Sequence, residues 1–497
     1  MFTPAPARVH ETHSGVVLLC GDRAYKVKKA LRTDFLDFGT VALREHACAR
    51  ELELNRRLAP DVYLGVAHLS DVGGGPPEPV LVMRRMPEDR RLSALLTAGN
   101  EEDPVDLPAL VRLLVGFHDQ AERSSEIDRA GTAEALRDRW RSLLGPLRAA
   151  PRELVDPPMI ERIEHRAMRY LDGRTSLLDN RINDGHIVDG HGDLLAEDIF
   201  DLPDGFRVLD CLDFDDRLRY VDRLDDIAFL AMDFDFLGRA ELGDRLVADY
   251  LHAAGDPAPT SLRDHYIAYR ATVRAKVDLI RLGQGEEAAG PRLRKHLSIA
   301  AQRLERAAVR LTLIGGLPGT GKSTVAEELS AATGAVSLSS DHVRKELARV
   351  GALDEEVGRF GAGRYCTAGR ARVYDELLWR ARVLLTSGVS VILDASWIDP
   401  DDRRRATEMA DAVAADVVSL HCVCPTDLAH QRIGRRRAHE SDATTAIADA
   451  MAATAAPWPE AVTVDTAGPL ADSVAVALGA WRRDTPAHTA AFELTTG

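Results

Sequence analysis

The sequence predicts two folded parts in succession, an α+β domain over residues 1–300 and an α/β domain with a parallel sheet over residues 301–497. Three observations predict them. Short β-rich segments near the start of the chain are followed by a long, mainly helical stretch that begins at Leu107. From Leu311 onward, strand patterns and helix patterns alternate. A glycine-rich segment joins the first of these later strands to a helix pattern.

Length and charge limit the class of protein. The chain has 497 residues, enough for roughly two to four domains of about 100–200 residues each. Hydrophobic residues make up 45% of it, which allows each domain a sizeable core. The formal net charge of −15 disfavours non-specific binding to DNA or to an anionic membrane. We therefore expect nucleic acid to be an improbable partner, and we expect no membrane partner.

The cysteines and the apolar runs indicate the compartment. Six cysteines are scattered along the chain, which is typical of a protein in a reducing cytosol. The N-terminus lacks the basic and apolar segments of a signal peptide, and no run of about 18 apolar residues occurs. We expect a cytoplasmic protein, and the sequence leaves its oligomeric state open.

The first domain is predicted to have a smaller lobe over residues 1–86 and a larger lobe over residues 87–300. In the smaller lobe, residues 8–29 form short strands, and Thr40–Leu58 forms a helix that ends before Pro60. The remaining predicted elements are a strand at Val80–Met83, helices over Leu107–Tyr170, a loop and strand over His191–Leu212, a helix at Leu224–Leu237, and helices over Ser261–Arg310, of which Pro291–Arg310 connects the two domains.

Lysines and carboxylates follow a definite order in this domain. Lys26 and Lys28 lie on a predicted strand, and the next helix carries Glu45, Glu51 and Glu53. Further on come His191-Gly192-Asp193, then Asp198, then Asp210 at the end of a strand and Asp213 three residues later. Phosphoryl transfer needs a carboxylate beside the attacking hydroxyl group and acidic ligands for Mg²⁺. Asp193 suits the first role, Asp198 and Asp210 suit the second, and Asp213 is the alternative to Asp210.

These residues resemble the aminoglycoside phosphotransferase family, which is built like a protein kinase and phosphorylates small-molecule hydroxyl groups. The chain matches its His-Gly-Asp motif, and Asp226-Ile227-Ala228 is similar to a later Asp-Leu-Ala of the family. The strand lysines and helix glutamates match the lysine–glutamate pair of kinase folds, and we expect Lys26, Lys28 and Glu51 at the nucleotide. The family carries Asn where this chain has Asp198, and Ser14-Gly15 is only a weak substitute for a glycine-rich loop. A kinase fold without activity is therefore a second interpretation.

The second domain contains a complete phosphate-loop motif, GxxxxGK[ST], between a strand and a helix pattern. Its residues are Gly316, Leu317, Pro318, Gly319, Thr320, Gly321, Lys322, Ser323 and the following Thr324. The glycines let backbone N–H groups turn inward around phosphate oxygens, and the helix N-terminus adds a favourable dipole. Lys322 is expected to reach the β- and γ-phosphates, and Ser323 to reach Mg²⁺. The predicted strands of this domain are Leu311–Gly315, Ala335–Leu338, Ser390–Asp394 and Val417–Val423.

Other polar residues of the second domain suit the transfer step. Asp341 follows the second strand and is suited to take the proton of an acceptor hydroxyl group, while Arg344 is suited to hold the acceptor. Asp394 ends the third strand and is suited to orient Mg²⁺. Arg432 and Arg435-Arg436-Arg437 are candidate lid residues for neutralising phosphoryl charge, although Arg435 to Arg437 also fit a solvated helix face.

This half resembles the phosphate-loop kinases that include the 5′-kinase domain of phage polynucleotide kinase, zeta-type toxins and gluconate kinase. The resemblance implies that Asp341 is the general base and that Arg344 contacts the substrate, and it keeps a nucleic-acid 5′-hydroxyl group open as an acceptor. The whole chain is similar to bacterial proteins described as bifunctional aminoglycoside phosphotransferase/ATP-binding proteins. Cys422 and Cys424 are predicted to be buried strand thiols rather than zinc ligands.

We therefore predict an ATP- and Mg²⁺-dependent phosphotransferase with two nucleotide sites that transfers the γ-phosphate to a small-molecule hydroxyl group. Two alternatives stay open. In the first, only the phosphate-loop half is catalytic and the kinase-like half is a sensor. In the second, the chain is a regulatory ATPase or a toxin-like module that acts on a nucleotide or a protein.

Overall fold

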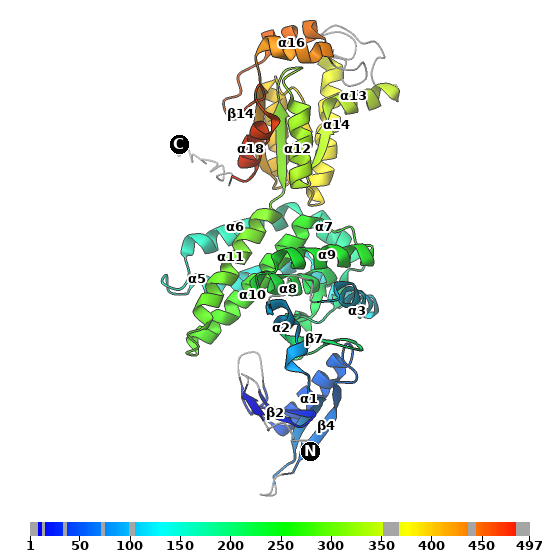
Figure 1. Ribbon diagram of the computed structural model, residues 1–497, viewed down its shortest axis with the longest axis vertical. Helices are drawn as coiled ribbons and strands as arrows, with labels where there is room; N and C mark the ends of the chain where they lie inside the picture. Colours follow the sequence, from blue (N-terminus) through cyan, green and yellow to red (C-terminus); the bar gives the residue numbers. More distant parts are fainter. Residues whose placement is uncertain are drawn as a thin grey trace, which may run out of the picture. The chain divides into compact units, whose positions relative to one another are not determined.

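The protein is described by a computed structural model, in which the chain divides into two compact units (Figure 1). The described residues are 8–11, 15–32, 37–70, 75–98, 105–350, 367–435 and 444–483. The first unit comprises residues 1–168, 178–258 and 262–307, and the second comprises residues 169–177, 259–261 and 308–497. In the described part of the chain, no helix combines the length and the apolar character needed to cross a bilayer.

The first unit begins with a five-stranded antiparallel sheet in the order β1-β2-β3-β5-β4. Its strands are β1 (Arg8–Glu11), β2 (Gly15–Cys20), β3 (Arg23–Lys28), β4 (Tyr63–Leu69) and β5 (Glu78–Arg84). One helix, α1 (Val41–Asn55), packs against β4 and β5. It begins after Thr40, whose side chain accepts a hydrogen bond from the N–H group of Leu43. Side chains two residues apart in a strand share one face, so Ala24, Lys26 and Lys28 project from the same side of β3.

The rest of the first unit is mainly helical and surrounds two short antiparallel β-ribbons. The helices are α2 (Leu92–Thr97), α3 (Leu107–Gln120), α4 (Ser125–Asp128), α5 (Ala133–Arg148), α6 (Pro157–Gly173), α7 (Thr175–Asn183), α8 (Arg223–Phe236), α9 (Ala240–Ala254), α10 (Thr260–Gly283) and α11 (Ala289–Ala307). The end of α6, the start of α7 and the start of α10 are counted with the second unit. The ribbons pair β6 (Ile187–Asp189) with β9 (Tyr220–Asp222), and β7 (Ile199–Leu202) with β8 (Gly205–Val208). Phe200, Leu202 and Leu209 pack into the same apolar cluster as Tyr63 and Leu81 of the sheet. This packing brings the end of β8, and with it Asp210, next to β3.

The second unit contains a five-stranded parallel sheet in the order β11-β12-β10-β13-β14. Its strands are β10 (Arg310–Gly315), β11 (Val336–Ser339), β12 (Val391–Asp394), β13 (Asp416–Val423) and β14 (Val462–Asp465). Its helices are α12 (Lys322–Thr333), α13 (Ser340–Arg349), α14 (Thr367–Thr386), α15 (Pro400–Ala412), α16 (Thr426–Arg435), α17 (Thr445–Thr454) and α18 (Leu470–Trp481). The helices α12 and α18 pack together against the sheet, and α14 and α15 form a second pair. Ile314, Val325, Leu329, Leu420 and Trp481 belong to one buried core cluster of this unit.

The structure confirms the predicted fold class of both halves. The first unit has the antiparallel sheet, the single sheet-packed helix and the helical lobe of a protein-kinase-like fold, and the second has the parallel sheet. All four strands predicted for the second half are present, and β14 was not predicted. This strand is short and lies at the edge of the sheet, and only Val464 is buried in it, so its sequence carries no strong apolar pattern.

Candidate active sites

Two lysines of β3 share one glutamate of α1. The Nζ atom of Lys26 lies 2.8 Å from Oε1 of Glu51, and Nζ of Lys28 lies 2.7 Å from Oε2 of the same side chain. Each lysine also binds a second carboxylate: Lys26 lies 2.9 Å from Oδ1 of Asp210, and Lys28 lies 2.7 Å from Oδ2 of Asp213. The structure thus brings five of the predicted site residues into one ion-pair network.

The other two candidate glutamates of α1 lie elsewhere. Glu45 contacts His68 at 2.8 Å, and Glu53 pairs with Arg50 one turn away on the same helix. Of the three, Glu51 alone contacts the two strand lysines among the described residues.

A sharp turn follows β8 and carries Asp210. The backbone of Asp210 has a φ angle of 60°, in the left-handed region that few residues other than glycine adopt. Its N–H group donates to the hydroxyl group of Tyr63 at 3.2 Å, and the next N–H group, of Cys211, donates to Oδ1 of Asn55 at 2.9 Å. Since Asn55 is the last residue of α1, the helix that carries Glu51 also holds this turn.

Asp226 holds the loop of His191, Gly192 and Asp193 by accepting two backbone hydrogen bonds from it. One Oδ atom of Asp226 accepts from the N–H group of His191 at 2.6 Å, and the other accepts from Gly192 at 2.9 Å. Although burial acts in the opposite direction, the hydrogen bond from His118 holds the pKa of Asp226 well below its usual range. Gly192 has a φ angle of 83°, so glycine suits this point of the loop.

Burial shifts the pKa values of the two aspartates that follow this motif. It raises the pKa of Asp193 to about 6, close to the value that suits a general base near neutral pH. Burial, and then the negative charge of Asp210, raise the pKa of Asp198 well above its usual value. The carbonyl oxygen of Asp198 accepts from the N–H group of Leu209 at 2.9 Å, which places Asp198 beside the turn with Asp210. A protonated Asp198 would be neutral, like the asparagine that the resembling family has there.

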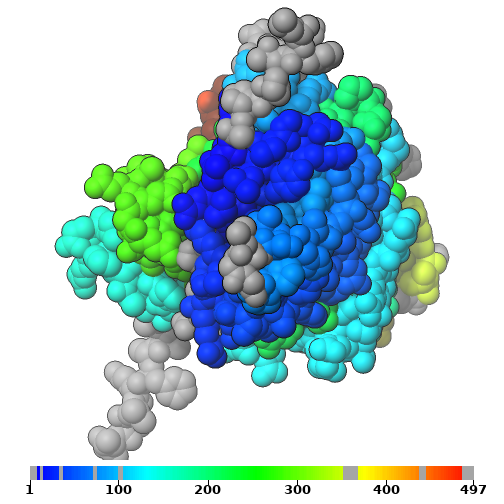
Figure 2. Space-filling view, turned by 90° about the horizontal axis from the view of Figure 1, so that it is seen from below, coloured from blue at the N-terminus to red at the C-terminus, as the bar shows by residue number. Residues whose placement is uncertain are grey.

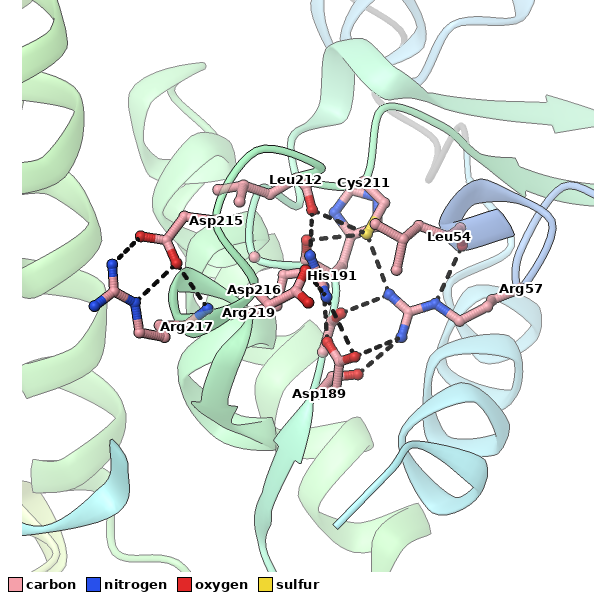
Figure 3. A network of polar contacts seen from close by, with 12 residues as sticks. Leu54, Arg57, Asp189, His191, Cys211, Leu212, Asp215, Asp216, Arg217 and Arg219 are labelled. Atoms are coloured by element: carbon pink, nitrogen blue, oxygen red, sulfur yellow. Dashed lines mark hydrogen bonds and ion pairs between the residues drawn. The ribbon is translucent and has the colours of Figure 1, made fainter. Parts of the chain in front are cut away.

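Two arginines tie these loops together, and no sequence pattern predicted either of them (Figure 3). Arg57, just beyond α1, donates to the carbonyl oxygens of Asp189 and Gly190 at 3.0 and 2.8 Å and to the sulfur of Cys211 at 3.2 Å. Arg219 is fully buried and pairs with Asp189 at 2.7 Å from the other side. Arg57 therefore connects the residues just before His191 with Cys211, the residue just after Asp210, and Arg219 connects Asp189 with the carbonyl oxygen of Leu212 at 2.9 Å.

In the second unit, the phosphate loop lies between β10 and α12. Gly316, Gly319 and Gly321 have φ angles of 147°, 86° and 79°. A Cβ atom added to Gly316 would lie 2.6 Å from the carbonyl oxygen of Cys422, and one added to Gly319 would lie 2.5 Å from that of Ala429. The glycines therefore provide both the backbone conformation and the space, as a loop wrapped closely around phosphate requires. Leu317 packs beside an apolar cluster of Ile398, Ile447 and Met451, while Thr324 is exposed.

We expect Gly319→Ala to lower the free energy of unfolding of the protein more than Gly334→Ala does. Both glycines have left-handed backbones, but nothing lies within 4 Å of a Cβ atom added to Gly334. The control should cost about 1–2 kcal/mol through backbone strain, and Gly319→Ala about 1–3 kcal/mol more through the clash. Urea unfolding of both variants measures the difference, and equal losses would contradict the crowding around Gly319.

Ser323 and Asp394 meet where the carboxyl ends of β10 and β12 lie side by side. The hydroxyl group of Ser323 donates to Oδ2 of Asp394 at 2.7 Å, and Lys322 is the first residue of α12. Asp341 lies in the first turn of α13, after the neighbouring strand β11, and Arg344 donates to its Oδ1 atom at 2.5 Å. Because the sheet is parallel, these residues gather at one edge of it.

Arg432 is linked to the phosphate loop by Thr466, a residue that was not predicted. It donates to the carbonyl oxygen of Thr466 at 2.7 Å, and the hydroxyl group of Thr466 donates to the carbonyl oxygen of Thr320 at 2.7 Å. Arg435 ends α16, whereas the predicted residues Arg436 and Arg437, and Ser14 in the first unit, lie outside the described residues.

The residues present fit Mg²⁺ bound together with a nucleotide. Across the described ranges, no three His, Cys, Asp or Glu side chains form a group that could hold a metal ion. Mg²⁺ in kinases is usually held by one or two carboxylates together with phosphate oxygens. Ser323 with Asp394 in the second unit, and Asp198 with Asp210 in the first, offer such donors, and the glycine loop is a cradle that a Cβ atom would fill.

Comparisons with known proteins identify relatives of the chain. The family model of the AAA domain matches residues 311–458. The chain is 48% identical over 476 residues to the uncharacterized protein Rv2004c of Mycobacterium tuberculosis (strain ATCC 25618 / H37Rv), and the match covers 95% of each chain. The same values hold for the uncharacterized protein Mb2027c of Mycobacterium bovis (strain ATCC BAA-935 / AF2122/97).

Solved structures are similar to separate parts of the chain. A choline kinase from Cryptosporidium parvum Iowa II matches 60% of this chain and 88% of its own, with 9% identity and a TM-score of 0.37. A sugar kinase from Janibacter sp. HTCC2649 matches 35% of this chain and 94% of its own, with 20% identity and a TM-score of 0.28.

Proposed function

We propose that this chain, which belongs to the family of the mycobacterial protein Rv2004c, is an ATP- and Mg²⁺-dependent phosphotransferase with one nucleotide site in each of two domains. The acceptor we propose is a hydroxyl group of a small molecule. The observation that carries the proposal is the contact of Ser323 with Asp394 at the end of a loop in which Gly316 and Gly319 leave no room for a Cβ atom. The match of residues 311–458 to the AAA domain supports it.

In the second unit, each proposed role follows from position. Bound MgATP would supply the phosphoryl group to be transferred. The phosphate-loop N–H groups and Lys322 would hold its phosphate chain, and Ser323 and Asp394 would hold the metal ion. Asp341 would accept the proton of the acceptor hydroxyl group as its oxygen attacks the γ-phosphorus and ADP departs. Since Arg344 now binds Asp341 at 2.5 Å, an acceptor would have to loosen this ion pair.

In the first unit, the proposed base is Asp193. It would accept the proton of a second acceptor, with its pKa of about 6 keeping most of the carboxyl group ionised at pH 7. Lys26 would orient the phosphates, held in place by Glu51. Asp198 and Asp210 would hold Mg²⁺, which would compete with the ion pair between Lys26 and Asp210.

A screen of hydroxyl acceptors with labelled ATP tests this function. The full chain, its Asp193→Asn variant and its Lys322→Ala variant should be compared on nucleosides, amino sugars, sugar acids and a 5′-hydroxyl oligonucleotide. We expect acceptor-dependent products of two kinds, one lost in each variant. Product formation that survives in both variants at the parent rate would refute the proposal.

In a second candidate function, only the phosphate-loop half of the chain transfers phosphate. The contacts of Lys26 and Lys28 favour it, because both lysines are engaged by carboxylates in the first unit. Under this alternative, every product disappears in the Lys322→Ala variant and none in the Asp193→Asn variant.

A further inference from the structure

Lys28 is enclosed on all the sides that the structure describes. Its side chain is only 4% exposed and lies between Glu51 and Asp213, each 2.7 Å from its Nζ atom. The ring of Phe38 covers the ammonium group, with its centroid 5.3 Å away. Arg44 fixes Phe38 by donating to its carbonyl oxygen at 2.8 Å. A nucleotide could therefore reach Lys28 only if this enclosure opened.

In the neighbouring pair, Lys26 and Asp210, the carboxylate faces outward instead. The side chain of Asp210 is 55% exposed and that of Lys26 is 15% exposed, compared with 17% for Asp213. One lysine–aspartate pair thus ends in an exposed carboxylate, whereas both members of the other pair are largely buried, and the two oxygens of Glu51 join the pairs. The sequence alone could not tell which aspartate is exposed or which lysine pairs with it.

The network carries more negative than positive charge. Although burial lowers it, the carboxylates of Glu51 and Asp213 keep the pKa of Lys28 above its usual value, so that the ammonium group stays charged. Two lysines face three carboxylates, which leaves one net negative charge. This excess lies beside Asp210, the only one of the three carboxylates with more than half of its side chain exposed.

We propose that Lys28 and Asp213 are a positioning pair that contacts neither nucleotide nor metal. The pair sets the net charge of the network and the orientation of the Lys26 and Asp210 side chains. This inference rests on the proposed nucleotide site of the first unit and narrows it, because Lys28 leaves the set of nucleotide contacts and Asp213 leaves the set of metal ligands. Lys28 holds one oxygen of Glu51, so that the other oxygen stays available to orient Lys26.

Lys28→Met and Asp213→Asn change the net charge of the network in opposite directions, so we expect them to have opposite effects on metal affinity. Lys28→Met removes a positive charge and frees Glu51 to draw Lys26 away from Asp210, so a divalent cation should bind about tenfold more tightly. Asp213→Asn removes a negative charge and frees Lys28 for Glu51, so the cation should bind about tenfold more weakly. The double variant restores the net charge and should return to within about twofold of the parent.

The test measures equilibrium binding of Mn²⁺ in the presence of AMP-PNP by electron paramagnetic resonance. It uses the full chain with Lys322→Ala as the parent, so that the phosphate loop contributes little nucleotide binding. Lys28→Arg is the matched control, because it keeps the charge and should leave the Mn²⁺ affinity near that of the parent. If Lys28→Met does not fold, the comparison of Asp213→Asn with Lys28→Arg still tests the pair.

Opposite shifts that cancel in the double variant would support the positioning role. Weaker Mn²⁺ binding in both single variants, with the double variant weaker still, would overturn it, since that is the pattern of two direct ligands or of a damaged fold. A parent that binds no Mn²⁺ with AMP-PNP would overturn the proposed nucleotide site of the first unit, and this inference with it. The two failures are therefore distinguishable.

Discussion

Replacing Lys322 by alanine is expected to weaken binding of MgAMP-PNP to the second unit by about 100-fold, corresponding to roughly 2–4 kcal/mol. The residue opens α12, where the helix dipole and the loop N–H groups already favour an anion. Within the described residues Lys322 forms no ion pair, so its ammonium group has no carboxylate to release before it binds phosphate. Isothermal titration calorimetry on a Lys26→Ala background, which lacks the lysine proposed to orient the phosphates in the first unit, measures the effect at the phosphate loop.

Lys345→Ala provides the control for this prediction. Lys345 is the other described lysine of the second unit and lies on α13, away from the glycine loop in sequence. Its removal changes the net charge of the unit by the same amount and should alter the affinity less than about threefold. If both variants lost affinity equally, the loss would come from the change in net charge, and the prediction that Lys322 contacts the phosphates directly would be wrong.

Asp193→Asn should lower the turnover of the first site by about 10²- to 10⁴-fold, which is the usual contribution of a general base. The side-chain shape and the support of the loop by Asp226 are retained, so the Michaelis constant for ATP should change little. Steady-state kinetics with the acceptor found in the screen give both constants. A large rise in the Michaelis constant with unchanged turnover would show that Asp193 binds substrate and does not act as the base.

The same variant should be more stable than the parent at alkaline pH. Burial raises the pKa of Asp193 from 3.8 to about 6, so the folded state holds the proton more tightly than the unfolded state does. The stability linked to this group is complete below about pH 4 and is lost as the pH rises through about 6. The gain of the asparagine variant at pH 8 is therefore up to about 3 kcal/mol, and it should vanish near pH 4. Urea unfolding at the two pH values measures it, and a gain that is independent of pH would contradict the buried carboxylate.

The phosphate loop was predictable because all its determinants are local in sequence. The motif, the preceding apolar strand and the following helix lie within residues 311–329, and the structure has each of them in place. Asp394 was predictable for a related reason, since it ends a buried strand and the carboxyl ends of parallel strands share one edge.

The choice among the candidates of the first unit needed the fold itself. The sequence offered two lysines, three helix glutamates and two late aspartates, and no spacing rule separates their partners. The structure pairs Lys26 with Asp210 and Lys28 with Asp213 because the cluster of Phe200, Leu202 and Leu209 presses the end of β8 against the sheet. Packing between distant segments decided the pairing.

Arg57 and Thr466 could not have been predicted, for a different reason. Both bind mainly backbone carbonyl oxygens, and every residue has one, so nothing in the sequence marks the partner. Figure 2 shows a face on which the early part of the chain, in shades of blue, forms most of the central surface.

The left-handed turn at Asp210 indicates that this position needs an acidic side chain despite the backbone strain. A glycine would adopt a φ angle of 60° with less strain, by about 1 kcal/mol. Glycine, however, would leave the outward-facing end of the lysine network without an acid. The chain therefore tolerates a strained backbone at a bend that presents the carboxylate of Asp210 to Lys26.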